Sequence, residues 1–382
     1  MLENLVTINS IISATMTSTI LMMLILLIRK KDRCFEKINP TVVLMVYLTC
    51  VFRMALPFEF DGVTLPISGG LFWRFVHDIL LITLIDTSLI RVKIIDAIVV
   101  IWLLIAIIKI AHYINNYVRI HHLLWNYSEK LDVEGYLVPD SSRFINIKVV
   151  SAPYIETPCC TGMFKRIIVI PKIKYSEQEL TQILRHEYEH LSNNDVVIKF
   201  VANILCCIYW WNPIAFYLQR NLNQSLEICC DMRVIKNYSK DNKIDYLETI
   251  LQEYKRNMDG DYEENMLFAM ADGQENEILE RFRAISSENN KKSLVSQMLI
   301  IIATIVITVF SYSYVVQACY EPTEIDMSGN VSFDCHNSYV RKANNGKYYM
   351  CYKESLFSTG LDLYEVKEDN LWYYEECGIK IK

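Results

Sequence analysis

The chain has 382 residues, 52% of them hydrophobic and only 21% charged, with a formal net charge of −6 at pH 7. A chain of this length is expected to form two or three structural units. The apolar excess indicates a membrane protein. The 44 acidic residues outnumber the 38 basic ones, which argues against nucleic-acid binding. Only 11 glycines and 9 prolines occur, so collagen-like and low-complexity classes are excluded as well.

Four apolar stretches are long enough to cross a bilayer as helices, which takes about 20 residues. They cover about 5–28, 40–58, 94–114 and 294–317. The first stretch is followed by a cluster of positive charge: Arg29, Lys30, Lys31 and Arg33. By the positive-inside rule this cluster is cytoplasmic, so residue 1 is expected outside the cell. Four crossings then predict that both termini are external.

The spans divide the chain into parts. The predicted parts are a membrane domain at 1–114 with an external loop at 59–93, a cytosolic domain at 115–293, a fourth span at 294–317 and an external tail at 318–382. The segment 71–92 is apolar but charged, and a charge at mid-bilayer costs at least about 2.5 kcal/mol. We therefore expect an external interfacial helix there. If 71–92 crossed the membrane, every later segment would change sides.

The cysteines are used differently on the two predicted sides of the membrane. Six occur as adjacent pairs in the cytosolic part, where thiols are expected. Four lie in the external tail: Cys319, Cys335, Cys351 and Cys377. A small tail of this kind is too short for a large core, so we expect two disulfides, with the connectivity open, in a small β module.

A helix with a metal-binding pattern is predicted from residue 176 onward. Ser176 and Glu179 have the spacing of a capping box, and apolar residues then recur at helical intervals. The helix carries His186-Glu187-Tyr188-Glu189-His190. Histidines four residues apart lie on one face, where both can bind one Zn²⁺, and Glu187 is placed to act as general base. The alternative is a plain helix with two surface histidines.

A catalytic zinc ion needs a third protein ligand and an open position. Glu227 and Asp231 share a helical face downstream, which suits one ligand and one acceptor for a ligating imidazole. Cys229 and Cys230 compete as ligands. Because thiolates tend toward closed structural sites, we expect these two cysteines to be buried side chains instead.

Further features stand in a specific order around this motif. They are Arg53-Met-Ala-Leu-Pro57-Phe-Glu, Thr157-Pro158 to Gly162 followed by Ile167-Ile-Val-Ile-Pro171, Asp195, Trp211-Asn212-Pro213, and Glu227 to Asp231. With the HExxH motif and the order of spans, the chain resembles the gluzincin metallopeptidases. It resembles most closely the BlaR/MecR-type antirepressor peptidases, the β-lactam-sensing signal transducers of Gram-positive bacteria.

This resemblance covers about residues 1–317. It implies a polytopic α-helical protein of the bacterial cell membrane with a cytosolic α+β gluzincin-type zinc metalloprotease domain. It further implies one Zn²⁺ per chain held by His186, His190 and Glu227, with Glu187 activating water and with Asp195 and Asp231 behind the ligands. The implied substrate is a cytosolic winged-helix transcriptional repressor. Self-cleavage and homo-oligomers are compatible with the resemblance, and no direct nucleic-acid contact is expected.

The resemblance stops at the fourth span. Such sensors carry an external penicillin-binding domain with an S-x-x-K nucleophile, whereas residues 318–382 contain no S-x-x-K. We therefore expect an inducer that is bound without acylation. The leading hypothesis is a regulatory zinc endopeptidase with an edge strand at 165–171 for its substrate. The alternatives are a housekeeping membrane gluzincin, of the CAAX-processing or quality-control type, and a non-proteolytic receptor or immunity protein with a structural zinc site.

Overall fold

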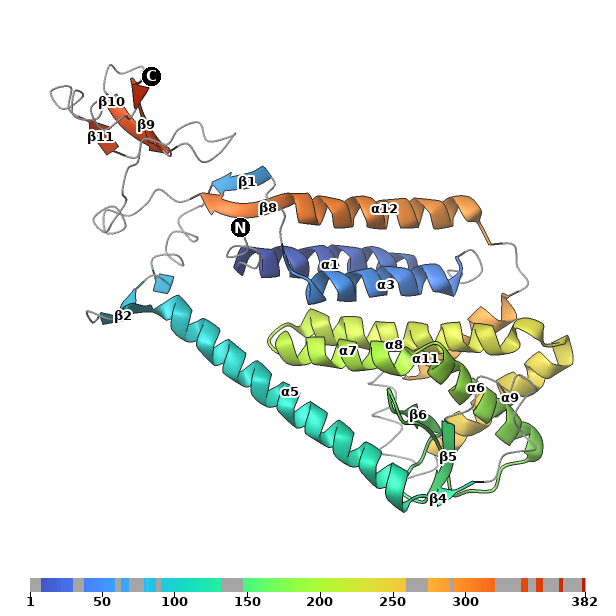
Figure 1. The fold of residues 1–382 in the computed structure, drawn as a ribbon. Helices are drawn as coiled ribbons and strands as arrows, with labels where there is room; N and C mark the ends of the chain where they lie inside the picture. The colour runs from blue at the N-terminus through green and yellow to red at the C-terminus, as the bar shows by residue number, and fades with distance from the viewer. Residues whose placement is uncertain are drawn as a thin grey trace. The chain divides into compact units, whose positions relative to one another are not determined.

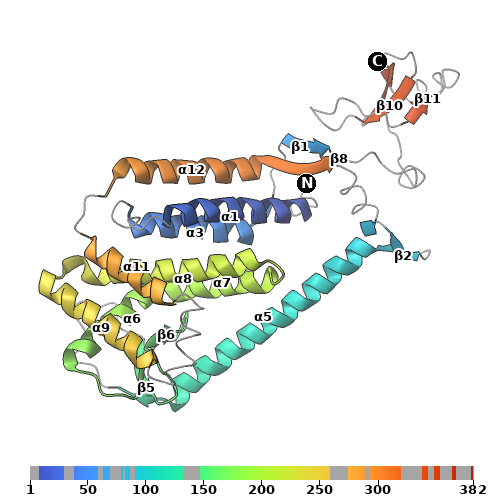
Figure 2. The same cartoon turned by 180° about the vertical axis from the view of Figure 1, so that it is seen from behind.

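The computed structural model (Figures 1 and 2) describes most of the chain outside its tail. The described residues are 8–29, 38–58, 63–68, 79–80, 82–86, 91–131, 147–258, 274–288, 292–319, 338–342, 348–352, 364–366 and 380–381. They fall into two compact units. One combines Met1–Ser13, Phe58–Ala97 and Phe310–Lys382, and the other combines Ala14–Pro57 and Ile98–Val309. The second unit holds the predicted metal-binding motif.

Three described helices are long and apolar enough to cross a membrane. They are α1 (Ile8–Arg29, with its apolar part at 10–29), α5 (Ile94–Tyr127) and α12 (Leu294–Ser313). The predicted second span is the shorter helix α3 (Pro40–Ala55), which begins where the side chain of Asn39 accepts a hydrogen bond from the backbone N–H of Thr41. Helix α5 continues beyond residue 114, where the prediction ended it. Its polar extension carries the chain on to the sheet described next.

A four-stranded sheet lies next in the chain. Its strands are β4 (Glu129–Lys130), β5 (Ile147–Ala152), β6 (Cys159–Thr161) and β7 (Arg166–Pro171), in the order β4-β5-β7-β6. β5 and β7 pair in parallel and are the most buried strands, because both are rich in Ile and Val. β6 pairs antiparallel with β7. The prediction of an edge strand at 165–171 is therefore wrong, since β7 lies between β5 and β6, and β6 is the edge.

Between the sheet and α12, the described residues form α6 (Glu177–Ser192), α7 (Asp195–Ile208), α8 (Pro213–Val234), α9 (Lys240–Met258) and α11 (Gln274–Ser286), with a short 3-10 helix, η2 (Ile235–Asn237), after α8. The predicted capping box is present, with Ser176 and Glu179 satisfying each other's backbone N–H groups. Ile183, Leu184 and Leu191 of α6 pack on the sheet. α6 and α7 are bent by 62° about a turn in which Asn194 has a left-handed φ of 57°. This bend separates the helix of the HExxH motif from the apolar helix α7.

The other unit is built from strands. β1 (Val63–Ser68) pairs in parallel with β8 (Tyr314–Cys319), and β2 (Thr83–Asp86) pairs antiparallel with β3 (Arg91–Lys93). In the described part of the expected helix at 71–92, residues 79–80 are helical, whereas 83–86 and 91–92 are strand, because β-branched residues such as Thr83 and Ile85 favour extended backbone. In the tail, β9 (Ser338–Lys342), β10 (Tyr348–Tyr352), β11 (Tyr364–Val366) and β12 (Lys380–Ile381) form one sheet. The side chains of the four tail cysteines lie outside the described part, so their disulfides stay a prediction.

Candidate metal centre

Three ligand atoms meet where α6 crosses α8. The Nε2 atoms of His186 and His190 are 3.2 Å apart. Glu227 of α8 faces both rings, with Oε2 at 3.3 Å from Nε2 of His186 and Oε1 at 3.4 Å from Nε2 of His190. The HExxH spacing places the two histidines on one face of α6. The approach of Glu227 depends on how α8 packs against α6.

These separations fit a metal ion. Ligand atoms about 2.1 Å from a tetrahedral ion lie about 3.4 Å from one another. The three measured separations of 3.2, 3.3 and 3.4 Å match that value closely. Two imidazoles and one carboxylate also form the donor set of a catalytic zinc site that keeps an open fourth position. The residues present therefore fit one Zn²⁺.

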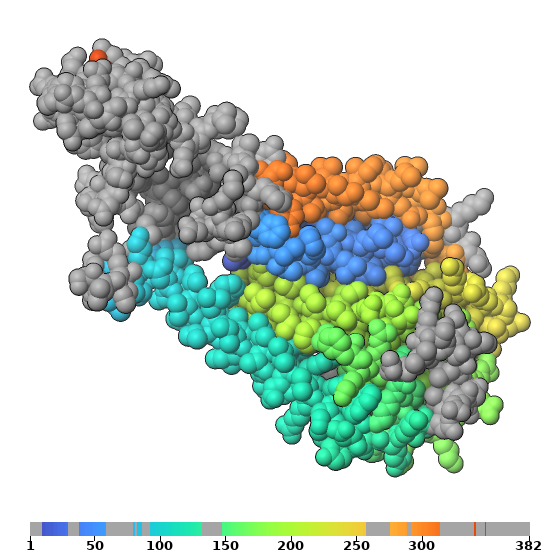
Figure 3. Space-filling view, in the orientation of Figure 1, coloured from blue at the N-terminus to red at the C-terminus, as the bar shows by residue number. Residues whose placement is uncertain are grey.

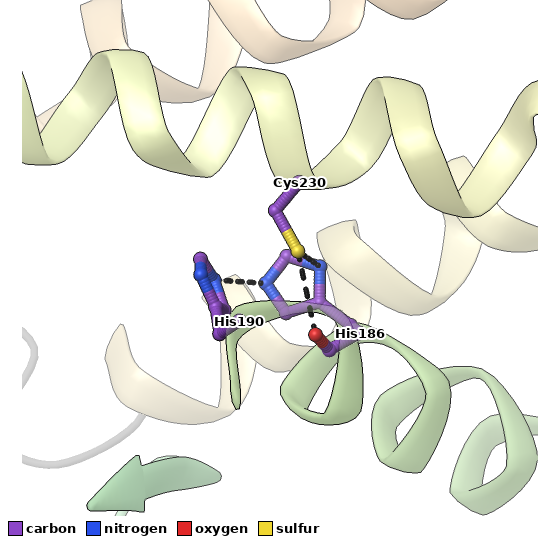
Figure 4. Close-up of side chains that lie close together, drawn as sticks. All are labelled: His186, His190 and Cys230. Atoms are coloured by element: carbon purple, nitrogen blue, oxygen red, sulfur yellow. Dashed lines mark hydrogen bonds between the residues drawn. The ribbon is translucent and has the colours of Figure 1, made fainter. Parts of the chain in front are cut away.

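Cys230 offers a second donor set beside the first. His186, His190 and Cys230 each contribute an atom to a group within 4.8 Å, and Figure 4 shows the three side chains together. However, the Sγ of Cys230 lies 3.6 Å from Nδ1 of His186 and donates a hydrogen bond to the backbone carbonyl of that residue at 3.3 Å. Nδ1 is on the side of the ring away from Glu227. We therefore favour Glu227 as the third ligand.

A carboxylate stands behind each histidine ring. Oδ2 of Asp195 lies 2.8 Å from Nδ1 of His190, and Arg233 donates to the same oxygen at 2.9 Å. Oδ1 of Asp231 lies 3.4 Å from Nδ1 of His186. Such partners fix the tautomer and the orientation of a ligating imidazole. The structure thus places Asp195 and Asp231, both singled out from sequence, directly behind the two rings.

Asp231 is the centre of a buried network. The hydroxyl of Tyr246 donates to it at 2.7 Å and also lies 2.8 Å from Nδ1 of His186. Arg281 of α11 donates to both carboxylate oxygens at 2.7 Å. Burial raises the pKa of Asp231, but the guanidinium of Arg281 outweighs it and lowers that pKa to about 2. Asp231 is therefore an anion at neutral pH.

The electrostatics of the centre favour a bound cation. Burial lowers the pKa of His186, but Cys230, Tyr246 and Asp231 outweigh it and raise that pKa well above its ordinary value. Burial raises the pKa of Glu227, yet Lys199 and the histidines outweigh it and hold that pKa well below its ordinary value. A site that attracts protons to its imidazoles also attracts a metal ion.

Glu187 borders two pockets that meet at the ligands. One, of about 210 Å³, is lined on its apolar side by Ile183 and Ile250. The other, of about 270 Å³, is lined by the edge strand β6 and by aromatic residues of α5 and α7. Both also contain Glu227, and Glu187 itself is only 7% exposed. A peptide bond at the junction of the pockets would lie beside the carboxylate of Glu187.

Several residues of the centre were missed by the sequence reasoning. They are Lys199, whose Nζ lies 2.9 Å from Oε1 of Glu227, together with Arg233, Tyr246 and Arg281. Lys199 did carry a signal, since it is the one basic residue in the apolar helix α7, one turn after Asp195. Tyr246 and Arg281 could not be identified from the sequence, because no local pattern connects them with the HExxH motif.

Comparison with known proteins identifies a family and several relatives. The family described as BlaR1 peptidase M56 matches residues 83–285, more than half of the chain. The chain is 24% identical to the regulatory protein BlaR1 of Staphylococcus aureus over 293 residues, covering 72% of this chain and 46% of that protein. It is 32% identical to the regulatory protein BlaR1 of Bacillus licheniformis over 103 residues, covering 26% and 17%. It is 26% identical to the methicillin resistance mecR1 protein of Staphylococcus aureus over 110 residues, covering 28% and 19%.

The chain spans less than half the length of each of these relatives. The family match covers the described part of the metal centre, from the sheet through the HExxH helix to Arg281 of α11. The chain therefore belongs to the BlaR1 peptidase M56 family.

Proposed function

We propose that the protein is a membrane-embedded regulatory zinc endopeptidase that responds to an external signal by cleaving a cytosolic protein. The observation that carries this proposal is the convergence of His186, His190 and Glu227 next to Glu187 at the junction of two pockets. A structural zinc site would need no such carboxylate, and it would not face pockets. This argues against the non-proteolytic alternative.

His186, His190 and Glu227 would hold the zinc ion. When bound, zinc supplies Lewis-acid chemistry: it polarises a peptide carbonyl and makes water more acidic. Glu187 accepts the proton of the attacking water and passes it to the amine that leaves. Asp195 accepts from Nδ1 of His190, and the hydroxyl of Tyr246, which donates to Asp231, accepts from Nδ1 of His186, so that both Nε2 atoms remain available as ligands.

The substrate is proposed to bind along β6. This strand is the last in the sheet order, and Cys159, Cys160 and Thr161 line the same pocket as Glu187. A peptide that adds to a sheet edge is held extended by main-chain hydrogen bonds. On β6 such a peptide would run past Glu187, whereas β7 is covered on both sides. We therefore propose that the substrate pairs with β6 and not with β7.

A polar network joins the first apolar helix to the metal centre. Arg29, the last residue of α1, is buried and donates to Asn221 at 3.1 Å and to Gln224 at 2.7 Å, both on α8. It also forms an ion pair with Glu280 of α11, whose neighbour Arg281 holds Asp231. A shift of α1 would therefore move Glu280 and Arg281, and with them the position of Asp231 behind His186. We propose this network as the path of the signal.

The proposed cytosolic substrate is a winged-helix transcriptional repressor, and the names of the relatives support a role in the response to β-lactam antibiotics. Homo-oligomers and self-cleavage belong to the same proposal. Within it, one zinc ion binds per chain and the protease domain faces the cytosol, with both termini outside.

The test is cleavage of a purified candidate repressor by the full chain in lipid vesicles. Wild type should cleave it, and Glu187→Gln should not. Glu189→Gln is the matched control, because Glu189 is a carboxylate on the same helix that lines neither pocket. Zinc-dependent cleavage that persists in Glu187→Gln and disappears in Glu189→Gln would refute the assignment of the base. An intact repressor with every variant would refute the proposed substrate.

A further inference from the structure

The helices α7 and α8 form a hairpin whose tip, at residues 209–212, lies among the apolar helices. We propose that this hairpin is re-entrant: it enters the membrane from the side of the metal centre and turns back near the middle of the bilayer. Its first helix, α7, is apolar and carries charge only at Asp195 and Lys199, both in its first two turns. The proposal concerns lipid contact and does not depend on proteolysis.

Two hydrogen bonds set the depth of the tip. Nε1 of Trp102 donates to the backbone carbonyl of Ile208 at 2.9 Å. Trp102 is the ninth residue of α5 and lies near the middle of the apolar stretch 94–114. The hydroxyl of Tyr209 donates to the backbone carbonyl of Met54, close to the end of α3, at 2.9 Å. Trp102 lies about 12 Å along α5 from residue 94 and Met54 about 21 Å along α3 from residue 40, so both markers place the tip inside the hydrocarbon layer and not at its surface.

The polar end of the hairpin fits the edge of the bilayer. The 14 residues of α7 rise about 21 Å, and half of the hydrocarbon layer is about 15 Å thick. With the tip at mid-bilayer, Asp195 at the start of α7 lies in the headgroup layer. Asn221 on α8 is nine residues beyond Asn212, or about 14 Å from the tip. It accepts from Arg29, the charged residue that ends α1, so both helices reach the membrane edge together.

Several polar groups of the hairpin are paired within it, as lipid favours, whereas the buried Nε1 of Trp210 at the tip has no hydrogen-bond partner among the described residues. The amide of Gln219 on α8 donates to Oδ1 of Asn203 on α7 at 3.0 Å, and Asn203 donates to the carbonyl of Lys199 at 2.7 Å. In the tip, the N–H of Tyr209 donates to the carbonyl of Leu205, and Asn212 caps the start of α8 through the N–H of Ile214. Polar pairs between helices of this kind are typical of membrane-embedded packing.

The outer face of the hairpin is apolar and continuous with the surfaces of the spans. Its large exposed side chains are Val201, Trp211, Phe216 and Tyr217. Phe52 of α3 and Ile101 of α5 are exposed in the same way. Figure 3 shows the surface of α7 and α8 directly against that of α1 and α3. Because α3 packs on both α7 and α8, lipid that surrounds α3 also meets the hairpin.

Fluorescence quenching by brominated lipids tests this proposal in the full chain. Wild type, Trp211→Phe and Trp125→Phe are reconstituted in vesicles whose acyl chains carry bromine either near the headgroup or near the chain end. The emission that Trp211→Phe loses relative to wild type belongs to Trp211, which is half exposed. Trp125 is the matched control, because it lies at the polar end of α5 with Lys148 and Lys165 over its ring.

A re-entrant hairpin predicts that most of the Trp211 emission is lost in lipid brominated near the chain end, with less loss in lipid brominated near the headgroup. The Trp125 emission should instead be quenched by iodide in water. Stronger quenching of Trp211 by the shallow bromines would show a hairpin lying on the surface and would overturn the proposal. Quenching by iodide alone would overturn it too. Wild-type zinc content in each variant shows that the fold is retained.

Discussion

The choice between Glu227 and Cys230 as third ligand is the sharpest prediction of the metal centre. The two residues lie one turn apart on α8, and both approach His186. Replacing Glu227 by Gln keeps the shape of the side chain and removes its charge. Replacing Cys230 by Ser removes the thiol. If Glu227 is the ligand, only the first change weakens zinc binding.

The expected loss follows from the ligand count. Structural zinc sites with four ligands bind with about 10–16 kcal/mol at pH 7, or roughly 2.5–4 kcal/mol for each ligand. One lost ligand should therefore weaken binding about 10²- to 10³-fold. The separations of 3.3 and 3.4 Å between Glu227 and the two Nε2 atoms support a full ligand contribution. Cys230→Ser removes the thiol contacts with His186 and His190 but not the carboxylate ligand, and it should change the affinity little.

The assay is competition for zinc between the purified full chain and a chelator of known affinity, in the same detergent for all variants. Glu227→Ala repeats the test without an amide that could still bind weakly. Circular dichroism checks that the variants keep their helices. Wild-type affinity in Glu227→Ala together with a large loss in Cys230→Ser would refute the ligand assignment and would favour the His-His-Cys set.

Other variants probe the surroundings of the metal. Glu187→Gln should retain zinc but lower the cleavage rate about 10²- to 10⁴-fold, and loss of zinc in that variant would contradict its role as base. Asp231→Asn should weaken zinc binding about 10- to 100-fold, measured by the same competition. Arg29→Met leaves Glu280 without its cation and should destabilise the fold by about 3–5 kcal/mol, with much of the loss recovered in Arg29→Met/Glu280→Leu. Zinc affinity should fall as the pH is lowered, beginning above neutral, because the pKa of His186 is raised well above its ordinary value and protons compete with zinc for the imidazoles; a flat profile would argue against histidine ligands.

Much of the metal centre could be predicted because its pattern is local. Histidines at positions i and i+4 must share a face of any α-helix, so His186 and His190 were identified without knowledge of the fold. The same periodicity placed Glu227 and Asp231 on one face of α8, and the capping box at Ser176 marked the start of α6. The long apolar stretches were equally local, since the length of a span is set by the thickness of the bilayer.

Other features could not be predicted, because they join residues far apart in the chain. The alternation of apolar residues predicted strands near 165–171, but only the sheet order shows that β6 is the edge. Arg281 reaches Asp231 across 50 residues of chain, and nothing in the local sequence indicates that contact.

The sequence by itself determined which residues can bind a metal ion and which helices are apolar, because helical periodicity and hydrophobicity act over a few turns. The tertiary structure decided how Glu227 approaches the histidines and which helices the tip of the α7–α8 hairpin contacts. These depend on packing between helices, as in the hydrogen bonds of Trp102 to Ile208 and of Tyr209 to Met54, which span 106 and 155 residues of chain. Contacts between residues so far apart in the chain depend on how the whole unit packs, and a local sequence pattern therefore does not predict them.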